Sequence, residues 1–156
     1  MDIASISNIK KELKNIPAED LQEIINRLAK YKKENKELLS YLLFDAYNET
    51  EYIRQVKEEI DVQFSGLNRT SFYLAKKTLR KVLRTTNKYI RFSGKKETEI
   101  ELLLYFCKKM KASRLNYKSS KVVFNMYINQ VKRIQKVISM LHEDIQFDYR
   151  EELEAL

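Results

Sequence analysis

Apolar residues recur every three to four positions along most of this chain, the spacing that gathers side chains on one face of an α-helix. The residues that break helices and shape tight turns are scarce, with two glycines and one proline among 156 residues. Abundant Leu, Lys and Glu favour helix as well. The sequence therefore predicts an all-α fold of six to eight helices packed as antiparallel pairs, in a helical bundle or a short array of helical hairpins.

Three helices are predicted in the first third of the chain. The first covers Ser7 to Lys14, and the second begins at Pro17, whose missing amide costs nothing at a helix start. The second helix is expected to bury a stripe of five side chains: Leu21, Ile24, Ile25, Leu28 and Tyr31. A third helix follows Asn35 and is apolar enough to lie centrally, with Leu38, Leu39, Leu42, Leu43 and Ala46 on it.

Four more helices are predicted in the rest of the chain. The fourth is capped by Asn48 or Thr50 and reaches Phe64, and the fifth, about 71–92, is capped by Asn68 or Thr70. The sixth begins near Glu97 or Thr98 and buries Ile100, Leu103, Leu104, Phe106, Cys107 and Met110. A seventh covers about 119–142. We expect one domain over 1–156, with an acidic tail at 144–156 that is either flexible or a short helix.

Four short segments resemble a family of uncharacterised bacterial helical proteins. They are Ile9-Lys10-Lys11-Glu12-Leu13, Pro17-x-Glu19-Asp20-Leu21, Lys33-Glu34-Asn35-Lys36-Glu37 and Phe147-Asp148-Tyr149. The similarity covers mainly the first fifty residues and the tail. The resemblance implies an all-α fold, and it implies no activity because that family has none established.

The composition indicates the cellular compartment and excludes some classes of protein. One cysteine, Cys107, cannot form an internal disulfide, so a disulfide scaffold is excluded and a reducing cytoplasm is expected. The N-terminus lacks the basic residues and apolar run of a signal peptide. No apolar stretch approaches the roughly 18 residues that a spanning helix needs. The sequence predicts a cytoplasmic protein without a transmembrane segment.

The charges are distributed very unevenly. No acidic residue occurs from Val62 to Lys96, whereas ten Lys and Arg residues fall in that stretch. Residues 67–122 carry a net charge of +13 in a chain whose total is +8. Helix surfaces normally mix the signs, because like charges four residues apart repel each other. The imbalance suggests that another molecule or another part of the chain neutralises this segment.

Six of these cations share one side of the predicted fifth helix, opposite its apolar face. We predict that they form a polyanion-binding site: Lys77, Arg80, Lys81, Arg84, Lys88 and Arg91. Flexible ammonium and forked guanidinium groups suit a row of phosphates, and counterion release favours binding without base-specific geometry. Tyr73, Tyr89 and Tyr117 are candidates for stacking on unpaired bases. The expected function is non-enzymatic binding of nucleic acid or another polyanion.

A second basic cluster follows, and it joins the first if the helices are neighbours: Lys108, Lys109, Lys111, Arg114, Lys118 and Lys121. Other interpretations stay open for both clusters. The basic face is solvated, or it pairs internally with Glu12, Glu34, Glu51, Glu58 and Glu59. A protein-interaction adaptor or oligomeric structural protein would use it to meet an acidic partner, and a membrane surface is a further alternative. The sequence leaves the oligomeric state undecided.

The chain offers no catalytic or metal-binding constellation, so no enzyme, metal or cofactor is predicted. His142, the single histidine, suits the end of the seventh helix. Cys107 lies among apolar residues and is expected to be a buried thiol, and Glu97, Glu99 and Glu101 suit a helix start. Six tyrosines are expected at the core edge with their hydroxyls in water, or in an aromatic groove for a partner: Tyr41, Tyr47, Tyr52, Tyr105, Tyr127 and Tyr149.

Overall fold

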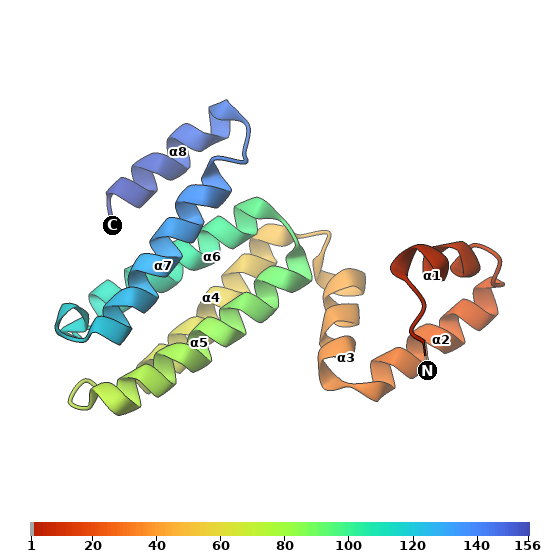
Figure 1. Ribbon diagram of the computed structural model, residues 1–156, viewed down its shortest axis with the longest axis horizontal. Helices are drawn as coiled ribbons and strands as arrows, with labels where there is room; N and C mark the ends of the chain where they lie inside the picture. The colour runs from red at the N-terminus through yellow and green to blue at the C-terminus, as the bar shows by residue number, and fades with distance from the viewer. Residues whose placement is uncertain (1) are drawn as a thin grey trace. The chain divides into compact units, whose positions relative to one another are not determined.

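The computed structural model describes residues 2–156, and all its regular structure in that range is helical (Figure 1). The eight α-helices in residues 2–156 confirm the predicted all-α class and helix number. The chain forms two compact units, Met1–Phe44 and Asp45–Leu156, which we call the first and second units. A single domain over 1–156 stays a prediction. None of the helices in residues 2–156 has the length and apolar character needed to cross a membrane.

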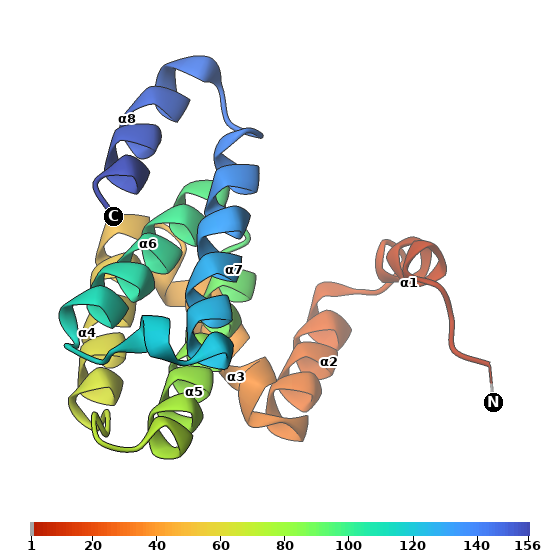
Figure 2. The ribbon, with the colours of Figure 1, turned by 60° about the vertical axis from the view of Figure 1, so that its left-hand side comes forward.

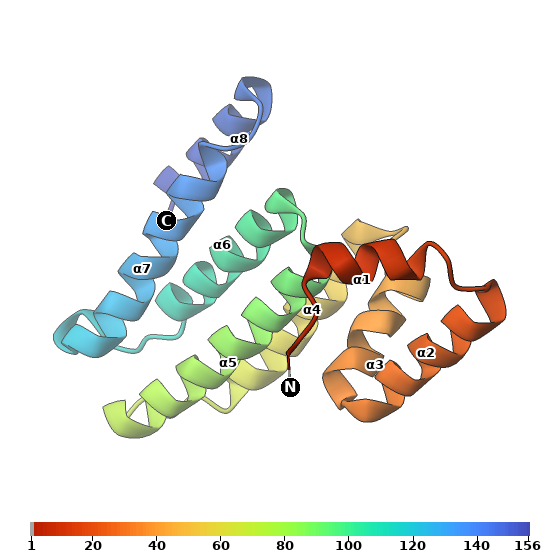
Figure 3. The same cartoon turned by 45° about the vertical axis from the view of Figure 1, so that its right-hand side comes forward.

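The first unit contains three helices, α1 (Ile6–Leu13), α2 (Ala18–Tyr31) and α3 (Lys33–Ser40), and a π-helical turn follows at Tyr41–Asp45. Figure 3 shows α2 and α3 side by side. The extended backbone of Lys32 separates them, and the Asn35 side-chain amide donates a hydrogen bond of 2.8 Å to the Leu28 carbonyl. This contact fixes the turn of the helical hairpin.

Two predictions for the first unit are wrong. Of the predicted buried stripe on the second helix, Leu21 is half-buried, whereas Ile24, Ile25, Leu28 and Tyr31 are exposed. The third helix is not central, because Leu38 and Leu39 are half-buried and Leu42 and Leu43 are exposed. Two paired helices cover only one side of each other. Periodicity therefore identified the apolar faces correctly and gave no information on what covers them.

The second unit contains the remaining five helices: α4 (Glu49–Ser65), α5 (Phe72–Ser93), α6 (Lys96–Ala112), α7 (Lys121–Ile138) and α8 (Glu143–Glu154). A 3₁₀ turn at Tyr117–Ser119 precedes α7. Figure 2 shows α4, α5, α6 and α7 side by side, with α8 folded back along the bundle. Consecutive helices run antiparallel, as the short connections predicted.

Local hydrogen bonds define where these helices begin and end. The Asn48 side chain caps α4 by accepting from the Glu51 amide at 3.2 Å, as predicted. The cap of α5 is Ser71 and not Asn68 or Thr70, since the Ser71 hydroxyl accepts from the Leu74 amide. Asn68 instead accepts from the Thr70 and Ser71 amides and so shapes the preceding loop. Gly94 ends α5 with a φ of 67°, which glycine adopts without strain.

The core of the second unit is built around α6. This helix packs against α4, α5, α7 and α8. It buries eight residues: Thr98, Ile100, Leu102, Leu103, Leu104, Phe106, Cys107 and Met110. The six apolar residues predicted for this helix are all buried, and Leu102 joins them on another side. A helix that is apolar over most of its circumference is stable only when other helices surround it.

The end of α7 differs from the prediction. The helix stops at Ile138 instead of continuing to 142, and His142 lies at the start of α8. The Nδ1 atom of His142 accepts a hydrogen bond of 3.4 Å from the Asp144 amide, so His142 is an N-cap and not a cation at a helix C-terminus. The predicted acidic tail at 144–156 forms most of α8, which packs on α7 and α6.

Several tyrosine hydroxyls bond within the second unit, contrary to the expectation that they face water. The Tyr52 hydroxyl donates to the Tyr89 carbonyl at 3.0 Å and ties α4 to α5. The Tyr105 hydroxyl donates to the Asp61 carboxylate at 2.7 Å and ties α6 to α4. Tyr47, in contrast, is exposed. Polar contacts of this kind fix the mutual rotation of helices that apolar packing leaves adjustable.

The buried face of α4 provides a stability test. Ile60 is fully buried, whereas Val62, on the same helix, is 72% exposed. We expect Ile60→Ala to lower the free energy of unfolding by about 2–5 kcal/mol, because it removes buried methylene groups and leaves a cavity. Val62→Ala is the matched control and is expected to change it by less than about 0.5 kcal/mol. Urea unfolding followed by circular dichroism measures both, and equal effects would contradict the described orientation of α4.

Candidate polyanion interface

Helix α5 has two faces of opposite character. Its inner face buries Ala75, Leu79, Val82, Thr86 and Ile90. The six cations predicted as the binding site lie on the other side, and we call them the basic stripe. Five of them are exposed, namely Lys77, Arg80, Lys81, Arg84 and Arg91, while Lys88 is half-buried. The helical spacing thus brings all six to one side of one helix.

Five members of the basic stripe have no polar partner in the second unit. Within residues 45–156, Lys77, Arg80, Lys81, Arg84 and Arg91 form no ion pair and no side-chain hydrogen bond. Lys88 differs, because its ammonium lies 4.6 Å from the centroid of the Tyr89 ring. The stripe is therefore a row of largely solvated like charges.

Several acidic side chains of α4 and α6 form contacts away from the stripe. Glu51 and Glu58 pair with Arg54 on their own helix, and Glu59 accepts a hydrogen bond of 2.5 Å from the Tyr89 hydroxyl. Glu101 pairs with Lys57 at 3.0 Å. Internal neutralisation of Lys77, Arg80, Lys81, Arg84 and Arg91 by Glu51, Glu58 or Glu59, one of the open interpretations, therefore has no ion pair to support it. Glu12 and Glu34, the other acids considered, belong to the first unit.

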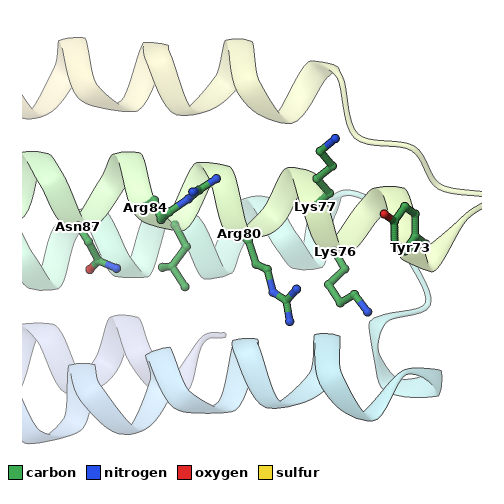
Figure 4. A pocket seen from close by; sticks show the side chains of 7 residues that line it. Tyr73, Lys76, Lys77, Arg80, Arg84 and Asn87 are labelled. Carbon is green, nitrogen blue, oxygen red and sulfur yellow. The ribbon is translucent and has the colours of Figure 1, made fainter.

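A hollow of about 460 Å³ runs along the basic stripe (Figure 4). All the residues that line it come from α5: Tyr73, Lys76, Lys77, Arg80, Leu83, Arg84 and Asn87. In Figure 4, Lys76, Arg80 and Asn87 extend toward α7, while Lys77, at the other edge of the stripe, points away from α7. The hollow therefore combines one apolar side chain, one aromatic ring and four cations. Lys76, which sequence reasoning left out of the stripe, is among these cations.

Arg133 of α7 fixes one end of this hollow. Its guanidinium donates to the Asn87 side-chain oxygen at 2.5 Å and to the Glu99 carboxylate at 2.6 Å. These bonds join α7 to α5 and to α6. Because Glu99 balances the charge of Arg133, the contact positions Asn87 without adding to the net charge of the stripe. No sequence pattern indicated this arrangement, since the three residues are far apart in the chain.

The three tyrosines considered for base stacking lie in different surroundings. Tyr73 is 72% exposed and lines the hollow beside Lys76 and Lys77. Tyr89 is half-buried and packs edge-to-face against Tyr52 and Phe92. The Tyr117 ring lies 5.2 Å from that of Tyr127. The structure therefore leaves Tyr73 as the accessible ring at the basic stripe.

The second basic cluster is partly neutralised. Lys108 pairs with Glu152 of α8 at 2.9 Å, and Lys109 pairs with Asp61 of α4 at 2.9 Å. The other four cations are exposed and unpaired within residues 45–156: Lys111, Arg114, Lys118 and Lys121. Arg69, just before α5, donates to the Ser113 carbonyl at 2.7 Å. This bond holds the end of α6 near the start of α5, so the unpaired cations lie at the Tyr73 end of the stripe.

Cysteine, glutamate and histidine often act in catalysis or metal binding, but the examples below have structural roles in this protein. Cys107 is fully buried, and this burial raises the pKa of its thiol to about 12. Glu99 and Glu101 form ion pairs with Arg133 and Lys57. His142 is an exposed helix cap. The absence of an enzymatic activity stays a prediction.

No family model, curated protein or solved structure matches this chain. The resemblance of its first fifty residues and tail to uncharacterised helical proteins therefore stays a prediction. The assignment of a function depends on the geometry of α5 and its neighbours.

The buried thiol allows a test of the α6 environment. At pH 8 we expect Cys107 to react with a disulfide reagent such as DTNB at least about 100-fold more slowly in the folded protein than in urea. The reason is that the raised pKa leaves little thiolate and the bundle blocks access. Absorbance of the released thiolate follows the reaction. Equal rates in the two states would show that Cys107 is accessible and α6 is not central.

The environment of the Asp61 carboxylate predicts that the stability of the protein depends on pH. Burial opposes its ionisation, but hydrogen bonds from Lys109 and Tyr105 outweigh burial and hold the pKa of Asp61 below its usual value. A lowered folded-state pKa stabilises the protein above the unfolded pKa, and this stability is lost as the pH falls toward the folded pKa. We expect Asp61→Asn to be less stable than the parent by at most about 1 kcal/mol at pH 7, because the site is partly exposed.

Urea unfolding at several pH values measures this difference. It should shrink below about pH 4, where the unfolded carboxyl is protonated. Asp148→Asn on α8 is the control, since Asp148 is exposed and unpaired within the second unit. A difference for Asp61→Asn that does not change with pH would contradict the ion pair.

Proposed function

We propose that the second unit binds nucleic acid along α5, with the basic stripe contacting phosphates. The observation that supports this most directly is the row of five exposed cations that form no ion pair in the second unit. The helices α4 and α6 pair six of their acids with Lys or Arg, whereas α5 carries no acid to pair with its own cations. A polyanion supplies the missing negative charge and releases its own counterions on binding.

The length of the stripe fits a nucleic-acid backbone. From Lys77 to Arg91 the helix rises about 21 Å at 1.5 Å per residue. One strand of a duplex places a phosphate about every 3.4 Å along its axis, so the stripe passes about six phosphates. Five or six cations on flexible side chains can reach that number. Contacts of this kind position a protein on the backbone and do not read the sequence.

The hollow beside the stripe suits an unpaired base. Tyr73 offers an exposed ring for stacking, and Leu83 offers an apolar floor. Asn87 is held in place by Arg133, and its amide group can bond to the edge of a base. A single strand lying along α5 would place phosphates on the stripe and a base in the hollow. We therefore expect single strands to bind at least as well as duplexes at equal salt.

Repulsion within the stripe supports a binding role over a structural one. Lys77 and Lys81, and likewise Arg80 and Arg84, are four residues apart, where like charges destabilise a helix by about 0.2–0.5 kcal/mol per pair. No contact in the second unit relieves this repulsion. Functional sites often retain such a cost because a ligand removes it.

Charge reversal on α5 tests the proposal. We expect Arg80→Glu/Arg84→Glu to reduce the affinity for labelled single-stranded RNA and DNA by at least about tenfold, while helicity and Tm stay equal or rise slightly. The matched control is Lys132→Glu/Lys136→Glu on α7, which changes the net charge equally at exposed positions without ion pairs in the second unit. Fluorescence anisotropy measures binding, and circular dichroism measures stability. Equal losses in both variants would show a general charge effect and contradict a site on α5.

A salt series tests the number of phosphate contacts. With five contacts, the slope of log affinity against log salt is about −4.5 on duplex and about −3.5 on single strands. Absence of binding near 100 mM salt, where close contacts survive screening, would contradict the proposal. Such a result would favour the alternative of an adaptor whose basic stripe meets an acidic protein.

A further inference from the structure

The side chain of Asn87 is held in one orientation by its neighbours. Its oxygen accepts a hydrogen bond of 2.5 Å from the Arg133 guanidinium, which also donates to the Glu99 carboxylate at 2.6 Å. A guanidinium has donors and no acceptor, so only the oxygen of the Asn87 amide can face it. The amide nitrogen therefore points elsewhere. In Figure 4 that nitrogen, drawn in blue, is on the side of Asn87 that faces Arg80.

The nitrogen of Asn87 is available to donate to a ligand. Within residues 45–156 this side chain forms no polar contact other than the bond from Arg133. Leu83 precedes Asn87 by about one helical turn, and both residues are half-buried and line the hollow. A flat base can therefore pack against Leu83 and turn its edge toward the Asn87 amide.

The polar side chains around that position are donors. Arg80 and Arg84 line the same part of the hollow, and guanidinium groups have no acceptor. The Glu99 carboxylate is not among the lining residues. Tyr73, whose hydroxyl can also accept, lies at the other end of the hollow, about 21 Å away along α5. A base at the Asn87 end thus meets side-chain donors and must itself supply the acceptors.

The bases differ in the exocyclic group that they would present here. Uracil and thymine carry the carbonyl O4 where cytosine carries the amino group N4, and guanine carries O6 where adenine carries N6. A carbonyl accepts from Asn87, whereas an amino group would meet another donor and lose its bond to water. The contact that asparagine usually makes with adenine needs the amide oxygen as well as the nitrogen. Arg133 already occupies that oxygen.

We propose that Asn87 makes the hollow selective for bases with a carbonyl group, namely uracil, thymine and guanine, over cytosine and adenine. Asn87 contacts the base, and Arg133 is a positioning residue that fixes the direction of the Asn87 amide. This inference rests on the proposed function, since it requires a single strand along α5 with one base in the hollow. It adds a preference among bases to phosphate contacts that are independent of sequence.

Strands made of a single base measure this preference. We expect RNA strands of uracil, about 12 nucleotides long, to bind at least about fivefold more tightly than strands of cytosine at equal salt and about pH 7.5. The two strands have the same length and charge, so the phosphate contacts cancel in the ratio of the two affinities. Fluorescence anisotropy with labelled strands measures both affinities.

Variants of Asn87 identify the source of the ratio. Asn87→Ala removes the donor and should bring the two affinities to within about twofold of each other. Asn87→Asp replaces the donor with an acceptor, so cytosine should bind at least as tightly as uracil, although the added negative charge weakens the binding of both strands. Asn129→Ala, at an exposed position of α7, is the matched control and should keep the parent ratio.

Arg133→Met tests the positioning role. It frees the oxygen of Asn87, so the amide can rotate and present either group to the base, and the ratio of affinities should fall toward one. Loss of one positive charge alone would weaken the binding of both strands equally and leave the ratio unchanged. The Asn87 variants remain decisive if Arg133→Met fails to fold, which urea unfolding detects.

The outcomes separate this inference from the proposed function. If neither strand binds at about 100 mM salt, the proposed function fails and the base preference fails with it. If both strands bind the parent protein equally tightly, the stripe binds phosphates and the selectivity of Asn87 is contradicted. A preference for uracil that survives Asn87→Ala would belong to another residue and would also overturn the proposal.

Discussion

Burial of α6 is the constraint on which the rest of the second unit depends. Its eight buried residues face several directions, so this helix needs neighbours on several sides. The helices α4, α5, α7 and α8 meet this need and are themselves amphipathic enough to leave an outer face for water. The orientation of α5 follows from this packing. Leu79, Val82 and Ile90 must point toward α6 and its neighbours, and the residues between them, including Arg80 and Arg84, must then point outward.

The same packing explains how the charges are distributed. Ion pairs in the second unit join helices across the bundle: Lys57 to Glu101, Lys109 to Asp61, Lys95 to Glu49 and Arg133 to Glu99. Each of them uses an acid from α4 or α6. The outer face of α5 is beyond their reach, and α5 itself has no acid because none occurs from Val62 to Lys96. Its five exposed stripe cations form no ion pair in the second unit because of both composition and position. An exposed ion pair would add little stability, so the absence of acids here costs the fold almost nothing.

The sequence predicted the helices better than it predicted their surroundings. Apolar spacing identified the buried face of α5 and six buried residues of α6, because a helix fixes the relative directions of its own side chains. It failed for Ile24, Ile25 and Leu28, since periodicity shows an apolar face and not its partner. The predicted cap of α5 was wrong because several side chains before the helix can accept from backbone amides: Asn68 accepts from the loop amides of Thr70 and Ser71, and Ser71 from the helical amide of Leu74. The bond from Arg133 to Asn87 was beyond prediction, because it depends on how three helices pack.

The two units expose surfaces of different chemistry, one apolar and one basic. The first unit exposes apolar side chains, and its basic and acidic residues are nearly equal in number. The second unit satisfies its own core and exposes a basic stripe that apolar contacts cannot neutralise. Phosphate contacts along one α5 are individually weak and independent of sequence, so a long strand offers the stripe many equivalent positions. Binding of this kind is expected to strengthen with the length of the strand and to weaken with salt.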